Sequence, residues 1–165
     1  MTEYEKRLNF LLEECLKELE TIDIRPYGKI LSIRENSRAK SRLGCCRQIK
    51  GGPFPQYRLE ISTMLKEWES QKLKEVIIHE VLHTCKGCLN HGALWKKLAA
   101  EVNKTYGYSI KRTAEPQNPE NVYRYRIRCI SCGNTSYRIK RSKIVQKPEI
   151  YQCARCGGAL EVDQL

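Results

Sequence analysis

Hydrophobic residues recur at helical spacing from the first residues of the chain. Thr2, followed three positions later by Glu5, has the pattern of a capping box, which favours a helix start at this point. The apolar positions that follow fall on one face of a helix. They are Tyr4, Leu8, Leu11, Leu12, Cys15, Leu16 and Leu19. We therefore expect an amphipathic opening helix, with Cys15 packed as a small buried hydrophobe.

Two segments further along have the pattern of short strands. Residues 28–34 and 57–62 combine apolar and β-favouring residues, and a stretch rich in Arg, Gly and Pro separates them. We predict that they form a long hairpin or meander.

Two helices are predicted after these strands. Residues 71–87 are predicted to form a helix whose apolar residues cover more of its circumference than a surface helix would show, so it should run through the core. Gly87 should end it. Residues 92–107 form the second helix, which should end near Gly107. Its expected apolar side consists of Leu94, Leu98 and Val102.

The pattern then changes to that of a linker and a second domain. Prolines and polar turn formers mark residues 109–122 as a linker, which leaves residues 1–108 as the first domain. Residues 123–165 form the second, in which 123–129 and 135–141 alternate like strands.

The charge of the chain indicates a class of binding partner. The formal net charge is +11, and residues 25–58 carry nine basic side chains against Glu35 alone. Such a balance favours polyanions, nucleic acid first, although a solvated basic surface would look the same. The chain has no apolar run long enough to span a bilayer, and its first residues mix charges of both signs. We therefore expect a cytoplasmic protein without a membrane partner.

All three histidines lie within residues 77–95, and two of them form an H-E-x-x-H pattern, His79-Glu80-Val81-Leu82-His83. Imidazoles at positions i and i+4 of a helix project from the same side and can reach one zinc ion, with Glu80 beside the open position. A turn through Lys86-Gly87 can return His91 as a third ligand. Three protein ligands and one water suit a catalytic zinc site and metal-assisted hydrolysis.

These residues resemble the SprT-like metalloprotease family, which includes the Spartan DNA–protein crosslink proteases. The resemblance rests on the run from His79 to His83, on His91-Gly92-x-x-Trp95 and on the upstream SRLGCC and LEISTML segments. It implies that His79, His83 and His91 hold the catalytic zinc and that Glu80 is the general base. It also implies an α+β fold: a zincin-like metalloprotease domain followed by a small β-rich C-terminal zinc ribbon. Metal chemistry assigns Glu80 the same role, because a carboxylate beside the ion can take a proton from water and deliver it to the leaving amine.

The loop between the histidine ligands contains a pair of cysteines, Cys85 and Cys88, that is not part of the family pattern. It could form a disulfide under oxidation, compete with His91 for zinc, or simply pack. A thiolate ligand would close the site and leave no position for water.

The last four cysteines have the spacing of a structural zinc site. Cys129/Cys132 and Cys153/Cys156 are two C-x-x-C pairs separated by twenty residues. The chain would therefore hold two Zn²⁺ ions, one catalytic and one structural. Aromatic and basic side chains around these pairs suggest contacts to single-stranded or distorted DNA, although tyrosines on a small sheet often only pack. The candidate contacts are Tyr125, Arg126, Arg128, Tyr137, Arg138, Lys140 and Arg141.

We interpret the sequence as that of a zinc-dependent metalloendopeptidase that acts on DNA-associated proteins, with DNA and protein substrates as its partners. One alternative is a nucleic-acid-binding zinc protein of the same fold that cleaves nothing. Another is a zinc hydrolase acting on a non-protein amide. The sequence does not indicate an oligomeric state.

Overall fold

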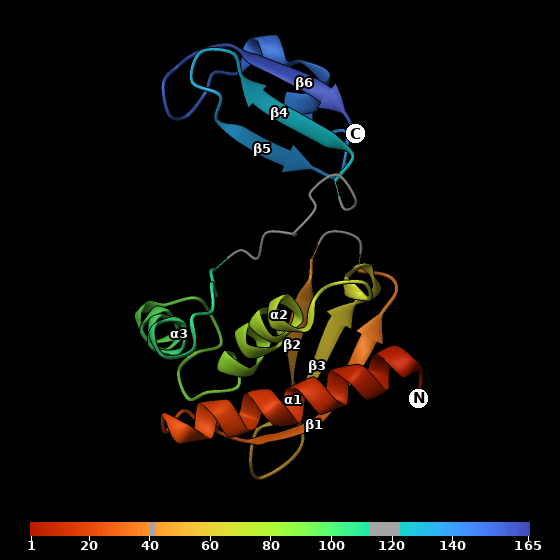
Figure 1. The fold of residues 1–165 in the computed structure, drawn as a ribbon, viewed down its shortest axis with the longest axis vertical. Helices are drawn as coiled ribbons and strands as arrows, with labels where there is room; N and C mark the ends of the chain where they lie inside the picture. The colour runs from red at the N-terminus through yellow and green to blue at the C-terminus, as the bar shows by residue number, and fades with distance from the viewer. Residues whose placement is uncertain (40–41, 113–122) are drawn as a thin grey trace. The chain divides into compact units, whose positions relative to one another are not determined.

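The computed structural model describes residues 1–39, 42–112 and 123–165 (Figure 1). Its helices and small sheets confirm the predicted α+β class. The chain divides into two compact units, Met1–Ala114 and Glu115–Leu165. Residues 113–122 of the predicted linker lie outside the described residues, so the domain bounds stay a prediction. Among the described residues, no helix combines the length and the apolar character that crossing a membrane requires.

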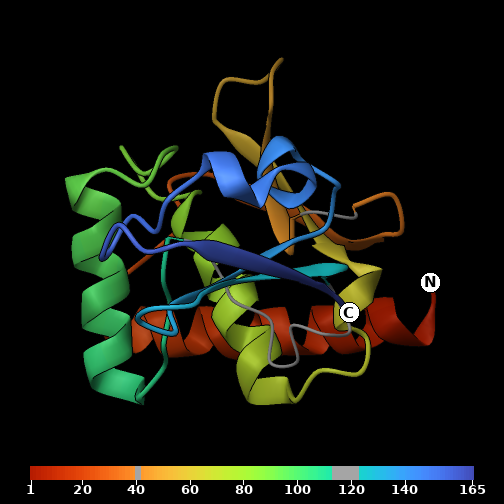
Figure 2. The same ribbon diagram turned by 90° about the horizontal axis from the view of Figure 1, so that it is seen from above.

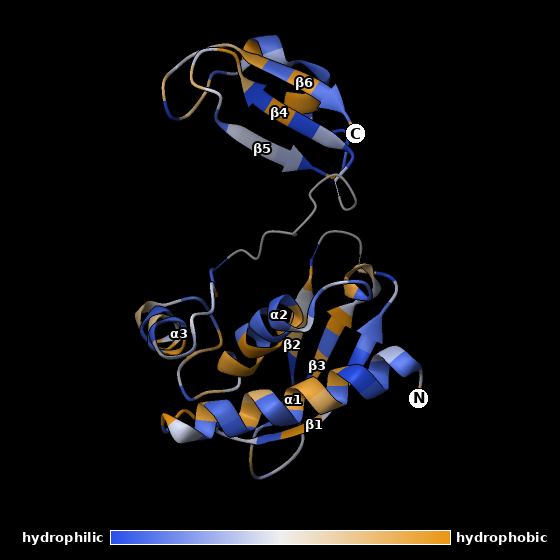
Figure 3. Cartoon of the chain, in the orientation of Figure 1, coloured by the Kyte–Doolittle hydropathy of each residue, from blue (hydrophilic) through white to orange (hydrophobic). Residues whose placement is uncertain are grey.

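The first helix, α1 (Glu3–Thr21), begins with the predicted capping box. The Glu5 N–H donates to the Thr2 hydroxyl at 3.1 Å, and the Thr2 N–H donates to the Glu5 carboxylate at 3.3 Å. The apolar side of α1 is buried as predicted, and Cys15 is completely enclosed. Figure 3 shows hydrophobic and hydrophilic residues alternating along this helix. The amphipathic pattern therefore places α1 against the core.

Three strands form the sheet of the first unit: β1 (Lys29–Asn36), β2 (Gly44–Ile49) and β3 (Gln56–Ser62). Their order is β1-β3-β2, and β3 runs parallel to β1 and antiparallel to β2. The predicted hairpin or meander of the first and last strands is therefore wrong, because both arrangements pair successive strands antiparallel. The intervening segment contains β2, whose sequence GCCRQI has a single β-branched residue and so lacks a recognisable strand pattern.

A short 3₁₀ turn, η1 (Thr63–Leu65), leads from the sheet to the buried helix α2 (Ser70–Leu82). The sequence predicts that this helix continues to Gly87, but it ends five residues earlier. The Thr84 N–H donates to the Val81 carbonyl at 2.8 Å, three residues back, which closes a tighter turn than an α-helix allows. This early end frees the loop that carries His91.

The next helix, α3 (Ala93–Tyr106), ends as predicted at Gly107, which adopts the left-handed conformation with a φ of +69°. Its buried side is formed by Trp95, Ala99 and Val102, whereas Leu94 is 44% exposed. Of the residues predicted for the apolar side of this helix, Val102 is buried and Leu98 packs against the core, so only Leu94 faces solvent. Helix α2 contacts both α1 and α3, and in the view from above it crosses over α1 (Figure 2).

A polar network ties the end of the first unit to α1. Glu18 accepts hydrogen bonds from Lys74 and from the Tyr108 hydroxyl, both at 2.7 Å, and its carbonyl accepts one from the Tyr106 hydroxyl at 2.6 Å. Tyr108 and Ile110 are buried in the hydrophobic core. The packed chain therefore continues beyond residue 108.

The second unit is a small antiparallel sheet with short helical turns. Its strands are β4 (Tyr125–Cys129), β5 (Thr135–Arg138) and β6 (Leu160–Gln164), in the order β5-β4-β6. The helical turns are α5 (Lys143–Gln146) and η2 (Pro148–Ile150). The first two strands lie within the predicted segments 123–129 and 135–141, and β6 was not predicted.

Replacing Leu59 with alanine should destabilise the protein strongly, because this side chain is fully buried on the central strand of the first sheet. Loss of buried methyl groups and the cavity left behind should lower the free energy of unfolding by about 2–5 kcal/mol. Leu31→Ala, at a position 43% exposed on β1, should cost less than about 1 kcal/mol. Denaturant unfolding of both variants measures the difference, and equal losses would contradict the assigned core.

Candidate active site

The three histidines converge on one point although they come from two parts of the chain. His79 lies in the last turn of α2, His83 caps that helix, and His91 lies in the loop before α3. The Nε2 atom of His91 is 2.9 Å from that of His79 and 3.2 Å from that of His83. The spacing of four residues places the first two imidazoles on one side of the helix, as predicted.

Backbone carbonyls fix the orientation of two of these rings. The Nδ1 atom of His79 lies 2.9 Å from the Lys111 carbonyl oxygen, and that of His83 lies 2.8 Å from the Cys88 carbonyl oxygen. A carbonyl only accepts, so each Nδ1 must carry the proton and donate it. In a neutral ring with this tautomer, the Nε2 atom is unprotonated and presents its lone pair to the centre of the cluster. Burial and the neighbouring imidazoles also lower the pKa of His79 to about 4, which keeps this ring neutral.

This arrangement fits a zinc ion. Facing lone pairs repel one another unless a cation lies between them, and neutral imidazole is a common zinc ligand. A tetrahedral ion with Zn–N distances of about 2.0–2.1 Å places its ligand atoms about 3.3–3.4 Å apart. The observed separations of 2.9 and 3.2 Å are close to that value. Second-shell carbonyls on the opposite ring nitrogen are also typical of metal-binding histidines.

Trp95 packs against all three imidazoles. Its ring centroid lies 4.8 Å from that of His79, 5.7 Å from that of His83 and 4.6 Å from that of His91. Only 2% of its surface is exposed, so the indole forms an apolar wall beside the cluster. The sequence identified Trp95 as part of a motif but assigned it no role. Its position, four residues after His91, was the available signal, because the two residues flank the start of α3.

Glu80 follows His79 on α2 and is buried, with 5% of its surface exposed. Burial raises the pKa of its carboxyl group to about 7, although a hydrogen bond from the Cys46 backbone and the charge of Arg42 work in the opposite direction. Gly44 lies directly against this carboxylate: a Cβ atom at Gly44 would be 2.5 Å from Oε1 of Glu80. Strand β2, which sequence patterns did not reveal, thus forms one side of the site.

Cys85 and Cys88 pack into the hydrophobic core of the first unit and form no disulfide. Of the described residues, only the three histidines belong to this metal-binding cluster. The packing alternative for the two cysteines is therefore the one observed. Burial raises the pKa of Cys85 to about 12, which disfavours a thiolate that could compete for zinc. Cys88 contributes to the site through its carbonyl oxygen instead.

The four cysteines of the second unit form a separate cluster. The sulfur atoms of Cys129 and Cys156 are 3.5 Å apart, and those of Cys132 and Cys153 are 3.7 Å apart, too far for disulfides. All four sulfurs lie within 4.8 Å of one another. Backbone N–H groups of Arg155 and Cys156 lower the pKa of Cys153 to about 6, which favours the thiolate that zinc binds. Both predicted ligand sets are thus assembled in the structure.

The predicted nucleic-acid contacts do not form one surface. Arg126 lies opposite Tyr137 in the sheet register, whereas Tyr125 lies opposite Arg138. Because successive side chains of a strand point to opposite faces, these two pairs lie on opposite sides of the sheet. Arg126 is paired with Asp163, and Arg128 with Glu161. Lys140 and Arg141 follow β5 and are exposed. Contacts of these residues with DNA stay a prediction.

Metal analysis should find two zinc ions per chain after zinc loading. His91→Ala removes one of three ligands from the first cluster and Cys132→Ser one of four from the second, so each variant should retain about one ion because the clusters share no ligand. Atomic absorption on each variant measures the content. Two ions in the His91→Ala variant would show that His91 is not a required ligand.

Comparison with known proteins agrees with this arrangement. A search of curated proteins finds no match to the chain. A scan of protein families matches residues 12–115 to the SprT-like family. The matched segment covers more than half of the chain and includes the three histidines, Glu80 and Trp95. The chain therefore belongs to the SprT-like family.

Proposed function

We propose that the protein is a zinc-dependent metalloendopeptidase of the zincin type that acts on DNA-associated proteins. The observation that carries this proposal is the convergence of three imidazole Nε2 atoms, with the buried carboxylate of Glu80 on the residue that follows His79. A metal ion with an open position and a carboxylate next to it are the groups that metal-assisted hydrolysis needs. The SprT-like family is generally associated with metalloprotease-like function.

The roles of the residues follow from their chemistry. The three imidazoles would hold a zinc ion, which would supply a Lewis acid for the scissile carbonyl and would lower the pKa of a bound water molecule. Glu80 takes the proton from the attacking water and delivers it to the leaving amine nitrogen. Burial raises the pKa of this carboxyl group towards neutrality, which suits a group that must both accept and release a proton. The Cys46 backbone holds the carboxylate in place for this transfer.

Among the described residues, β2 is an edge strand with β3 on one side only, and this edge supports a polypeptide substrate over a small amide. The Ser62 N–H donates to the Leu43 carbonyl at 2.8 Å, which fixes the alternation of the ladder between β2 and β3. By that alternation, every second residue of β2 directs its backbone groups away from β3. These residues are Gly44, Cys46 and Gln48, of which Cys46 already donates its N–H to the Glu80 carboxylate. An extended peptide added along this edge would pass beside the general base.

The charge of the chain supports the proposal that the protein meets its substrates on nucleic acid. The chain carries a formal net charge of +11, and binding to a polyanion would raise its effective concentration near proteins on the same polymer. Local concentration could then replace a selective pocket for the substrate side chains.

Glu80→Gln should retain zinc and lose proteolysis. The amide keeps the size of the side chain but accepts no proton, so cleavage of a denatured protein should slow by at least about 100-fold. Glu101→Gln makes the same chemical change at an exposed position of α3 and should cleave normally. Gel-based cleavage assays with and without single-stranded DNA measure both. Full activity in the Glu80 variant would refute the mechanism, and DNA binding without cleavage by the unaltered protein would support the non-catalytic alternative.

Gly44→Ala should impair catalysis without removing the metal. A methyl group at this position would overlap the Glu80 carboxylate and displace the base. The three nearest atoms to the added methyl group all belong to Glu80 and none to an imidazole, so the metal ligands should keep their positions. We expect a loss of at least about tenfold in kcat, because even a displacement of about 1 Å is costly in an active site. Gly52→Ala is the matched control, since its added Cβ would have no neighbour closer than 3.5 Å. Equal activity in the two variants would show that β2 does not position Glu80.

A further inference from the structure

One face of the first sheet is basic and open to solvent. Along the central strand β3, Tyr57, Leu59 and Ile61 are buried, whereas Arg58 between them is exposed. Side chains alternate between the two faces of a strand, so Arg58 points away from the core. The sheet register places Arg47 of β2 directly beside Arg58, and Arg34 of β1 beside Glu60. Three arginines from three strands therefore share this outer face.

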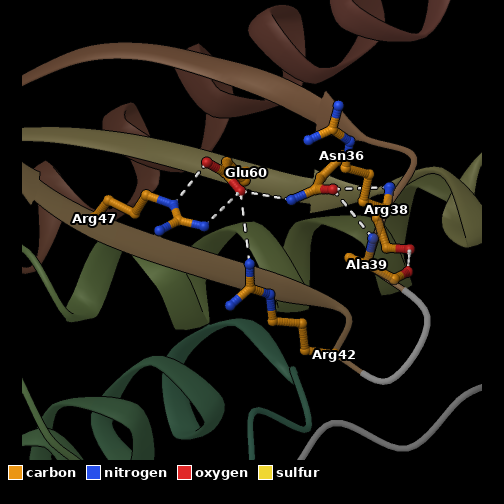
Figure 4. A network of polar contacts seen from close by, with 7 residues as sticks. Asn36, Arg38, Ala39, Arg42, Arg47 and Glu60 are labelled. Atoms are coloured by element: carbon orange, nitrogen blue, oxygen red, sulfur yellow. Dashed lines mark hydrogen bonds and ion pairs between the residues drawn. The ribbon is translucent and has the colours of Figure 1, made fainter.

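The charges on this face are not balanced. Glu60 is the acid of the outer face, and Arg47 donates to it at 2.7 Å while Asn36 donates at 2.6 Å (Figure 4). In the part of the chain that the structure describes, no ion pair involves Arg34 or Arg58. Like charges directly opposite in a sheet repel each other, as Arg47 and Arg58 do. An anionic ligand on this face would relieve that repulsion.

The second unit offers a useful contrast. There the arginines that point to one side of β4, Arg126 and Arg128, are each paired with an acid on β6. Internal pairing leaves such side chains less available to phosphates. The outer face of the first sheet thus presents unpaired cations, which a phosphate backbone can neutralise with release of counterions.

Exposed aromatic side chains lie at one end of the same sheet. Tyr27 precedes β1 and is 54% exposed, and Phe54 precedes β3 and is 75% exposed. The two segments adjoin, because the Lys29 N–H donates to the Pro55 carbonyl at 3.1 Å. Unpaired bases stack on such rings, whereas bases inside a duplex are not accessible to them. This feature favours a single strand.

We propose that the outer face of the β1-β3-β2 sheet binds the phosphate backbone of single-stranded DNA, with Arg34 and Arg58 as direct contacts. The inference rests on the nucleic-acid partner of the proposed function and is independent of its proteolysis. It assigns a binding surface to the unit that contains the histidine cluster, separate from the residues predicted around the cysteine pairs.

The test is the salt dependence of binding of the full-length, zinc-loaded protein to a labelled oligothymidine. The double variant Arg34→Gln/Arg58→Gln should bind more weakly, and its plot of log affinity against log salt should be shallower by about 1.4, because each phosphate contact on a single strand contributes about 0.7. The control, Lys17→Gln/Lys97→Gln, removes the same charge from exposed positions of α1 and α3. Its slope should match that of the unaltered protein.

A second variant tests the face in the opposite direction. Glu60→Gln removes the negative charge among the three arginines while it keeps the size of the side chain, so affinity for the oligothymidine at low salt should increase. Equal losses in both double variants would show that only total charge matters and would overturn the proposal, as would an unchanged slope in the arginine variant. Zinc content and Glu80-dependent cleavage of a DNA-free substrate are measured in parallel, so a failed protease assay is distinguishable from a failed binding surface.

Discussion

Two hydrogen bonds to backbone carbonyls underlie the chemistry of this protein. They hold the protons of His79 and His83 on Nδ1 and thereby direct two Nε2 lone pairs to one point. If either ring adopted the other tautomer, its Nε2 atom would present an N–H group to the cluster, and the site would no longer suit a cation. The early end of α2 is part of the same constraint, because the turn that follows it places the Cys88 carbonyl within reach of His83. Fold and metal centre are therefore determined together.

Features that depend on local periodicity were predictable from the sequence. The capping box at Thr2 and the buried side of α1 follow from spacing within a single helix, as does the placement of His79 and His83 on one side of α2. The two pairs of cysteines were predictable for a similar reason, since each C-x-x-C pair closes over a short turn. In each case the interacting residues are separated by four positions or fewer, so chain geometry alone brings them together.

Features that depend on distant contacts were not predictable. The parallel pairing of β1 with β3 arises because β3 lies between β1 and β2 in the sheet. The sequence of β2 has no recognisable strand pattern from which this order could be predicted. The contact of Gly44 and Cys46 with Glu80 joins segments more than thirty residues apart in the sequence. The residues chosen around the cysteine pairs illustrate a different limit. Composition identified basic and aromatic side chains, but only the sheet register shows that they divide between two faces and that two of the arginines are paired.

The carbonyl that orients His79 belongs to Lys111, five residues after α3 ends and past the predicted end of the first domain. A shortened protein that stopped at residue 108 would still contain every imidazole and the general base. It would lack the acceptor for His79 and the buried side chain of Ile110. The smallest autonomous piece of this chain that can hold its metal therefore extends at least to residue 111, and the segment leading towards the second unit belongs to the scaffold of the first.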